Sequence, residues 1–190
     1  MESKKMKYTD LKDMLKQTGE VYGDRPAYML KTETKGEMKQ VTHKEFRNEI
    51  NALGTALIKM GLKDKRIAVI SENRYEWELA YLSIAAGTGI VVPLDKSLPA
   101  NELELLIERS DIEAIFYTKK YSEIIQNIRL SEKNKLKHLI SMDNDENGEG
   151  IYSQKELIRE GKKLIEEGNN EFLNAKINPK EMEIMLFTSG

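Results

Sequence analysis

The chain has 190 residues, enough for one sizeable core, and 39% of them are hydrophobic while 33% are charged. Its 30 basic and 32 acidic residues leave a net charge of -2 with both signs mixed along the chain, which argues against broad nucleic-acid binding. The absence of cysteine excludes disulfides, thiolate nucleophiles and cysteine-bound metals.

We expect no export or membrane signal in this sequence. The segment MESKKMKYTD is basic, but no apolar stretch follows it as a secretory signal would require. The longest uncharged run, Leu79–Leu94, is shorter than the roughly 20 residues of a membrane span, and Gly87, Gly89 and Pro93 interrupt it. The two histidines are far apart and in no metal-binding spacing. We therefore expect a cytoplasmic protein without a transmembrane segment, a metal site or a nucleic-acid partner.

Residues 1–41 are predicted to form a short helix and a hairpin. The helix is expected at about Thr9–Gly19. The stretch AYMLKTETKGEMKQV alternates weakly around Lys35 and Gly36, which suits an exposed two-stranded ribbon. We expect this unit to precede an α/β subdomain at residues 42–190.

A long helix is predicted after Thr42 and is marked at both ends. Thr42 and Glu45 form a T-x-x-E capping box, in which each side chain bonds the backbone of the other residue. Gly61 stands where a left-handed residue ends a helix. Between them apolar residues recur at helical spacing, at Phe46, Ile50, Leu53, Leu57 and Met60. The pattern predicts a helix of about 18 residues with one buried face.

Short apolar runs then alternate with helical patterns. Strands are predicted at RIAVI, GIVVPL, EAIFY and KHLISM. Asn73 is expected to cap the helix after the first strand, and Ser153 with Glu156 forms a capping box for the last helix. Buried strands separated by helices indicate an α/β fold with a largely parallel sheet and helices on both faces.

The chain ends with an apolar segment that leads into a small polar turn. IMLF, residues 184–187, is predicted to be a fifth strand, and Thr188, Ser189 and Gly190 follow it directly. Ligands of open α/β sheets bind beyond the carboxyl ends of the strands. Two hydroxyls and a glycine there can bond an anion and let the backbone approach it. Taken alone, however, the three residues are more typical of an ordinary loop.

Other α/β chemistries fit the strand ends poorly. A dinucleotide site needs GxGxxG after its first strand, where this chain has SENRYEW. A phosphoacceptor domain needs an aspartate after a central strand, but Thr118, Lys119 and Lys120 follow EAIFY. A Walker loop is absent from the sequence. The first and third chemistries are excluded, and the second is weak.

Several motifs occur in a characteristic order. Asn73-Arg74 with Glu76-Trp77 opens a helix, Gly87 precedes Val92-Pro93-Leu94-Asp95, Leu98-Pro99 opens the next helix, and Thr188-Ser189-Gly190 ends the chain. In this order they resemble the AMP-forming adenylating enzymes, and most of all the long-chain fatty acyl-CoA synthetases, whose phosphate loop opens with threonine-serine-glycine. The resemblance covers Tyr8 to Gly190, and Ala85-Ala86 and Lys96 are small departures from the family pattern.

The resemblance implies a two-step reaction. A fatty acid carboxylate attacks the α-phosphate of ATP to give an acyl-adenylate and pyrophosphate, and the thiol of coenzyme A then displaces AMP. The full-length enzyme would use ATP, Mg2+ and coenzyme A, with Thr188, Ser189 and Gly190 binding phosphate. The family's catalytic residues would lie downstream. The chain is thus expected to be the front third of a larger enzyme, with an incomplete subdomain at 42–190 that alone neither adenylates nor binds ATP tightly.

Two alternatives remain open: a free-standing α/β interaction or regulatory domain without catalysis, and an adenylating enzyme for another carboxylate. Within the motifs, structural roles are expected for Asn73 as a helix cap, Trp77 as a core residue, Asp95 as a turn cap and Arg74 as an ion-pair partner. We also expect the chain to self-associate or to be marginally stable, and peripheral membrane association is compatible with the resemblance.

Overall fold

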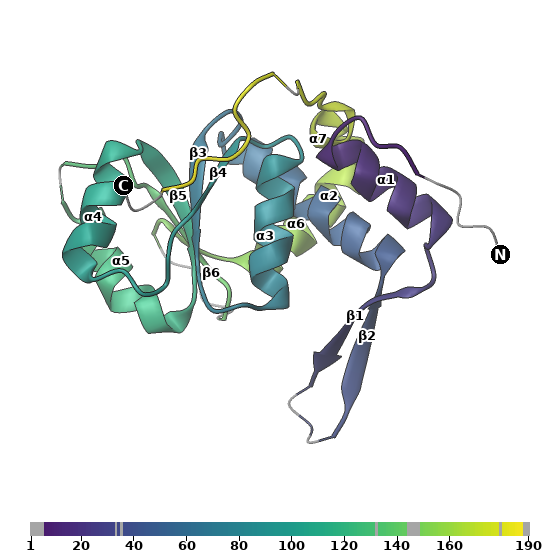
Figure 1. Ribbon diagram of the computed structural model, residues 1–190, viewed down its shortest axis with the longest axis horizontal. Helices are drawn as coiled ribbons and strands as arrows, with labels where there is room; N and C mark the ends of the chain where they lie inside the picture. Colours follow the sequence, from purple (N-terminus) through teal and green to yellow (C-terminus); the bar gives the residue numbers. More distant parts are fainter. Residues whose placement is uncertain are drawn as a thin grey trace.

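The structure is a computed structural model that describes residues 6–32, 34, 36–131, 133–143, 149–178 and 180–187. Figure 1 shows an α/β body from which a two-stranded ribbon projects. The predicted α/β class, with a parallel sheet preceded by a helix and a hairpin, is confirmed. No helix within the described ranges is both long and apolar enough to cross a membrane.

The N-terminal helix and hairpin form as predicted. Helix α1, Leu11–Val21, begins after Asp10, whose side chain accepts a hydrogen bond from the backbone N–H of Asp13 at 2.8 Å. Strands β1, Pro26–Lys31, and β2, Met38–Thr42, pair antiparallel. Lys35 of the predicted turn lies outside the described residues. Leu15 of α1 and Val41 of β2 are buried in one core with the helix that follows.

That helix, α2, spans His43–Lys59 and has the predicted capping box. The backbone N–H of Glu45 donates to Thr42 Oγ1 at 3.2 Å, and the backbone N–H of Thr42 donates to Glu45 Oε2 at 2.8 Å. Such a cap stabilises a helix by about 1 kcal/mol. Gly61 follows the helix with φ at 82°, in the left-handed region expected for a residue that ends a helix.

Five parallel strands form the central sheet in the order β4-β3-β5-β6-β7. Their bounds are β3 Arg66–Ile70, β4 Ile90–Pro93, β5 Ile112–Tyr117, β6 His138–Ser141 and β7 Ile151–Ser153. The four predicted strands are confirmed. Strand β7 was not predicted, because three residues after a polar loop make no recognisable apolar run.

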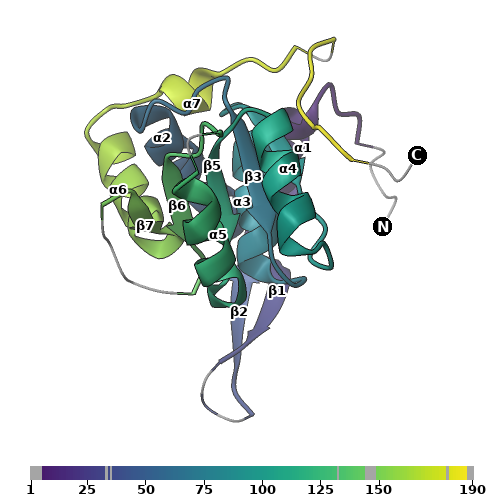
Figure 2. The ribbon, with the colours of Figure 1, turned by 90° about the vertical axis from the view of Figure 1, so that its left-hand side faces the viewer.

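Helices cover both faces of this sheet (Figures 1 and 2). Alternate residues of β3 belong to different cores, Ile67 and Val69 to one and Ala68 and Ile70 to the other. The first core is completed by α2, by α3, Tyr75–Ala85, and by α6, Gln154–Glu166; the second is completed by α4, Ala100–Arg109, and α5, Ser122–Arg129. A single turn of 3-10 helix, Lys119–Tyr121, precedes α5.

Close backbone contacts fix α2 against its neighbours. A Cβ added to Gly161 of α6 would lie 1.8 Å from the carbonyl oxygen of Ala52, so only glycine lets the two helices approach this closely. The short helix α7, Glu171–Asn174, packs on α2 through Phe172, which is completely buried. No helix was predicted here from the sequence, since one phenylalanine gives no periodic pattern.

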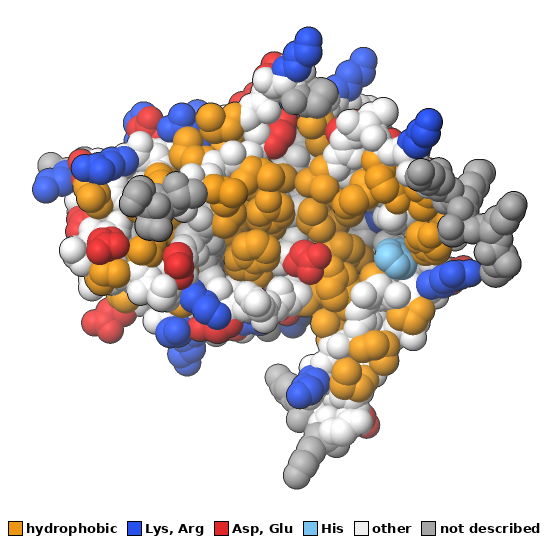
Figure 3. Space-filling model, viewed as in Figure 1, with side chains coloured by type: hydrophobic (Ala, Val, Ile, Leu, Met, Phe, Trp, Pro, Cys, Tyr) orange, Lys and Arg blue, Asp and Glu red, His pale blue; other side chains and the backbone are white. Residues whose placement is uncertain are grey.

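The face seen in Figure 1 carries a concentration of hydrophobic side chains over α3, as Figure 3 shows. Trp77 and Tyr81 of α3 are half-buried, and their rings stack with centroids 5.2 Å apart. Trp77 packs against the core, as predicted, but does not enter it fully.

Candidate functional site

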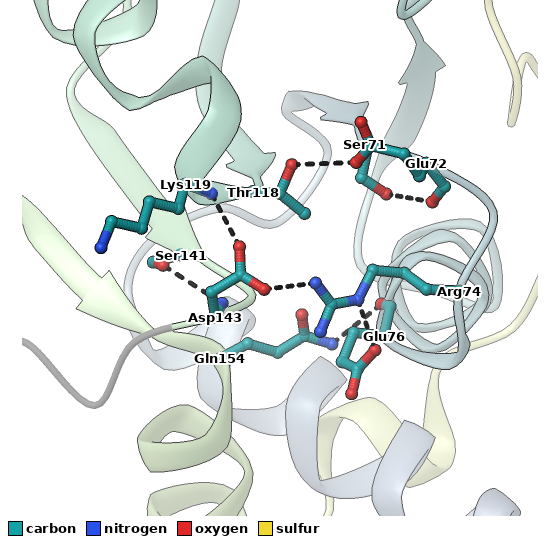
Figure 4. Close-up of polar contacts among 9 residues, drawn as sticks. All are labelled: Ser71, Glu72, Arg74, Glu76, Thr118, Lys119, Ser141, Asp143 and Gln154. Carbon is teal, nitrogen blue, oxygen red and sulfur yellow. Dashed lines mark hydrogen bonds and ion pairs between the residues drawn. The ribbon is translucent and has the colours of Figure 1, made fainter. Parts of the chain in front are cut away.

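The strand order indicates a candidate site at the carboxyl edge of the sheet, between β3 and β5. The chain runs from β3 to β4 on one side and then crosses to β5 on the other side, so the two connections leave in opposite directions. Open α/β sheets bind their ligands at such a reversal, beyond the carboxyl ends of the strands. Glu72 follows β3, Thr118 and Lys119 follow β5, and Asp143 follows β6, and their polar groups meet at this edge (Figure 4).

Arg74 and Asp143 form the centre of the network. Arg74 forms an ion pair with Asp143 and another with Glu76, in which its Nε lies 2.6 Å from Oε2. The second oxygen of Asp143 accepts the backbone N–H of Lys119 at 2.7 Å. Burial raises the pKa of Asp143, but the bonds from Lys119 and Arg74 outweigh it and leave the pKa below its usual range. Asp143 thus joins the end of β6 to the loop after β5 and to the start of α3.

A second carboxylate and a buried amide extend this network. Glu72 accepts hydrogen bonds from Lys120 Nζ at 3.1 Å and from Thr118 Oγ1 at 3.3 Å. Gln154, at the start of α6, is only 2% exposed, and its Nε2 donates to the carbonyl of Glu76 at 3.0 Å. Its Oε1 has no hydrogen-bond partner in the described part of the chain. These contacts tie α6 and α3 to the same edge of the sheet.

The arrangement is a paired network rather than an open anion site. Arg74 and Lys120 both face carboxylates within it. The predicted ion-pair role of Arg74 is therefore confirmed. Within the described ranges, no group of three or more histidine, aspartate and glutamate side chains is placed to bind a metal ion.

The predicted cap at Asn73 is wrong. Helix α3 begins at Tyr75, and the N-cap residue is Arg74, whose backbone is extended at φ -157° and whose side chain makes no capping bond. Asn73 is exposed and lies one residue upstream of the capping position. The predicted role of Asp95 is confirmed, because its Oδ1 accepts the backbone N–H of Ser97 at 2.8 Å.

The predicted fifth strand at residues 184–187 is also wrong: the segment forms a single parallel bridge to β4, between Ile184 and Val91. The backbone N–H of Val91 donates to Glu183 O at 3.0 Å, and the N–H of Met185 donates to Val91 O at 3.0 Å. Pro93 is the next residue of β4 on this side, and it has no N–H to donate. The ladder therefore stops, but the segment still runs parallel to β4 toward the carboxyl edge.

The predicted phosphate-binding residues Thr188, Ser189 and Gly190 lie outside the described residues, so their role stays a prediction. The structure instead brings together Asp143, Thr118 and Gln154, which the sequence analysis did not select. Thr118 comes directly after β5 and Asp143 is the second residue after β6, and their place close to strand ends is the signal that could have identified them.

Comparisons with known proteins identify the family. Long-chain-fatty-acid–CoA ligase 5 of Rattus norvegicus is 25% identical over 162 residues, 80% of this chain and 23% of that protein. Crotonobetaine/carnitine–CoA ligase of Salmonella paratyphi A is 22% identical over 149 residues, 76% of this chain and 29% of that protein. The structure of a long-chain-fatty-acid-CoA ligase from Archaeoglobus fulgidus has the same fold, with a TM-score of 0.77 and 18% identity over 97% of this chain and 36% of that one. The chain thus spans between 23% and 36% of the length of these proteins. Because residues 15–190 match the family described as AMP-binding enzyme, the chain belongs to the AMP-binding enzyme family.

Proposed function

We propose that this chain is the N-terminal part of an AMP-forming acyl-CoA ligase whose substrate is a long-chain fatty acid. The enzyme would join the carboxylate to the AMP moiety of ATP with release of pyrophosphate, and the thiol of coenzyme A would then take the acyl group with release of AMP. The three relatives named above are CoA ligases by their names, and two of those names specify long-chain fatty acids.

One structural observation carries the proposal. The segment that ends at Phe187 lies beside β4 and runs parallel to it, so the chain is directed toward the carboxyl edge of the sheet immediately before Thr188. Beyond this edge α/β sheets bind phosphate-bearing ligands, which supports a phosphate-binding role for the residues that follow Phe187.

In this proposal the three residues after Phe187 bind the phosphates of ATP. The hydroxyls of Thr188 and Ser189 donate to phosphate oxygens, and Gly190 lets the backbone come close because it has no Cβ. Such bonds hold the α-phosphate in position for attack and stabilise the charge that develops on it. Within the described residues, no group of three or more histidine, aspartate and glutamate side chains is placed to hold the Mg2+ that this reaction implies.

The assignment of a long-chain acid is the finer part of the proposal. The named relatives act on different acids, since one is a crotonobetaine/carnitine ligase. The alternative is therefore an adenylating enzyme for another carboxylate, and the acid that the enzyme accepts distinguishes the two.

Thioester formation tests the proposal. The protein would be expressed from the uninterrupted reading frame and assayed with ATP, Mg2+, coenzyme A and carboxylates from acetate to palmitate. We expect palmitoyl-CoA and AMP as products, and a loss of at least tenfold in kcat/KM for Ser189→Ala, against little change for Ser97→Ala in the turn after β4. Products with short acids alone would contradict the long-chain assignment, and no product with any acid would favour a binding domain without catalysis.

The chain by itself is proposed to be inactive. With only three loop residues it lacks most of the groups that would hold a nucleotide, so we expect no ATP binding at micromolar concentration in calorimetry. A micromolar dissociation constant for ATP would contradict this expectation.

A further inference from the structure

A hollow of about 520 Å³ lies between α1, α2 and the segment that follows α7. This volume is within the range of small-molecule sites, roughly 300–1,000 Å³. Apolar side chains form much of its wall, contributed by Leu15, Ile50, Ala86, Phe172, Ala175 and Ile177. The wall therefore suits a ligand with an apolar body.

The ammonium group of Lys12 reaches into the same region. Its Nζ lies 4.3 Å from the ring centroid of Phe172 and donates a hydrogen bond to the carbonyl of that residue. Within the described part of the chain, Lys12 has no ion pair with a carboxylate. Burial lowers the pKa of Lys12 to about 8, although Asp10 acts in the opposite direction. A half-buried cation whose contacts are a carbonyl and a ring face would gain from a carboxylate partner.

A second cation lines the hollow from α2. Arg47 donates from Nη1 to the carbonyl of Lys16 at a long 3.5 Å, and its Nε is buried with no hydrogen-bond partner among the described residues. The guanidinium therefore adds positive potential to the wall of the same hollow without being neutralised by a carboxylate within the described ranges.

The nearest acidic groups are already engaged. Asp10 accepts the backbone N–H of Asp13 at 2.8 Å, while Asp13 accepts Gln17 Nε2 at 2.9 Å and the backbone N–H of Thr9 at 3.0 Å. The titratable and charged groups around the hollow are thus Asp10, Lys12, Asp13, Lys16 and Glu20 of the α1 region, Arg47 of α2, and Lys176 after α7. The four cations exceed the three carboxylates in this set.

We propose that this hollow binds a small monocarboxylate with an alkyl body, whose carboxylate pairs with Lys12 while the alkyl chain lies against Phe172 and Ile177. The inference does not rest on the proposed function, because it concerns α1, α2 and the region of α7 and needs neither ATP nor coenzyme A. Failure of the thioester assay would therefore not contradict this inference, and failure to bind a monocarboxylate in the hollow would not contradict the proposed function.

Titration calorimetry of the 190-residue chain tests the site, with sodium octanoate as the probe and 1-octanol as its uncharged counterpart. We expect saturable octanoate binding that is at least tenfold tighter than octanol binding. Lys12→Met should weaken octanoate at least tenfold, whereas Lys44→Met, at an exposed position of α2 outside the hollow, should leave it unchanged.

Two further measurements do not depend on the fold of the Lys12 variant. Ala175→Leu places a larger side chain in the wall and should also weaken binding at least tenfold. In the unaltered chain at pH 8, pairing with a carboxylate raises the pKa of Lys12, so binding should take up about half a proton, measured by comparing buffers of different ionisation enthalpy. No octanoate binding, equal affinity for octanol, no proton uptake, or full affinity in folded Lys12→Met would each overturn the proposal.

Discussion

The ring of Phe172 lies so close to Gly54 that a Cβ at position 54 would be 2.2 Å from the ring atom Cε2. Glycine within a helix costs about 1 kcal/mol relative to alanine, so the helix itself would favour alanine at this position. The close approach of the ring, and not the conformation of α2, therefore requires glycine. Gly54 is the point at which α7 is anchored to α2.

Replacement of Gly54 by alanine should destabilise the chain. Overpacking a tight core position costs about 1 to 3 kcal/mol, which exceeds the gain in helix propensity. Urea unfolding of Gly54→Ala measures the change. In a Phe172→Ala background the clash is absent, so the same substitution should become neutral or stabilising. If Gly54→Ala is equally destabilising in both backgrounds, the ring contact is not the cause.

Local patterns in the sequence predicted most of the secondary structure. Helix α2 was predictable because Thr42, Glu45 and Gly61 mark its ends, and the four longer strands because each is a continuous apolar run. Features that depend on tertiary structure were not predictable. Nothing in the sequence near Gly161 shows that Ala52 approaches it, and the IMLF run reads as a strand because Pro93, which stops the ladder, is some ninety residues away.

The candidate site was less predictable than the fold. Arg74 and Asp143 are 69 positions apart in the chain, and only the order of the strands brings them together. The residues that the motifs selected, Thr188 to Gly190, lie outside the described residues. Asn73 was misassigned because capping residues are identified by type, whereas the start of α3 is displaced by one residue.

Asp143 should make stability depend on pH in the acid range. Its pKa lies below the ordinary value in the folded chain, so it stabilises the fold above the unfolded pKa of about 3.9, and this contribution is lost as pH falls through the folded pKa. Asp143→Asn should lower the free energy of unfolding at pH 7 by about 1 kcal/mol, with a difference from the unaltered chain that shrinks toward pH 2.

Arg74→Met is the matched test of the pair. We expect Asp143→Asn to cost less in the Arg74→Met background, with a coupling free energy of about 1 kcal/mol at pH 7 in a double-mutant cycle. Additive effects of the two substitutions would show that the ion pair adds nothing to stability.

The charged form of Lys12 should destabilise the fold, which makes stability depend on pH in the alkaline range. Its pKa is about 8 in the folded chain and about 10.4 unfolded, so between these values the unfolded chain holds more protons and stability rises with pH. Lys12→Met should stabilise the chain at pH 7 by about 1 kcal/mol, a figure reduced for partial exposure of the amine, and the gain should disappear near pH 10.5. Lys44→Met serves as the control. A gain that is constant with pH would show that the charge is not its cause.

Self-association of the 190-residue chain is expected to involve the segment beside β4. Its side chains are unusually exposed for apolar residues, at 66% for Leu186, 42% for Phe187 and 41% for Ile184. Leu186→Glu should shift sedimentation toward the monomer at micromolar concentration, whereas Leu130→Glu, which removes a leucine that is 81% exposed after α5, should not. A chain that is monomeric without either substitution would contradict the expectation.

Both edge strands of the sheet have features that limit the addition of further strands. Pro93 removes a donor from the outer side of β4, beyond the bridge to Ile184, and β7 at the opposite end has only three residues. Proline and short length are devices by which proteins keep exposed strand edges from joining into intermolecular sheets. Copies of this chain that meet should therefore associate through side chains and remain separable, instead of merging their sheets into amyloid-like polymers.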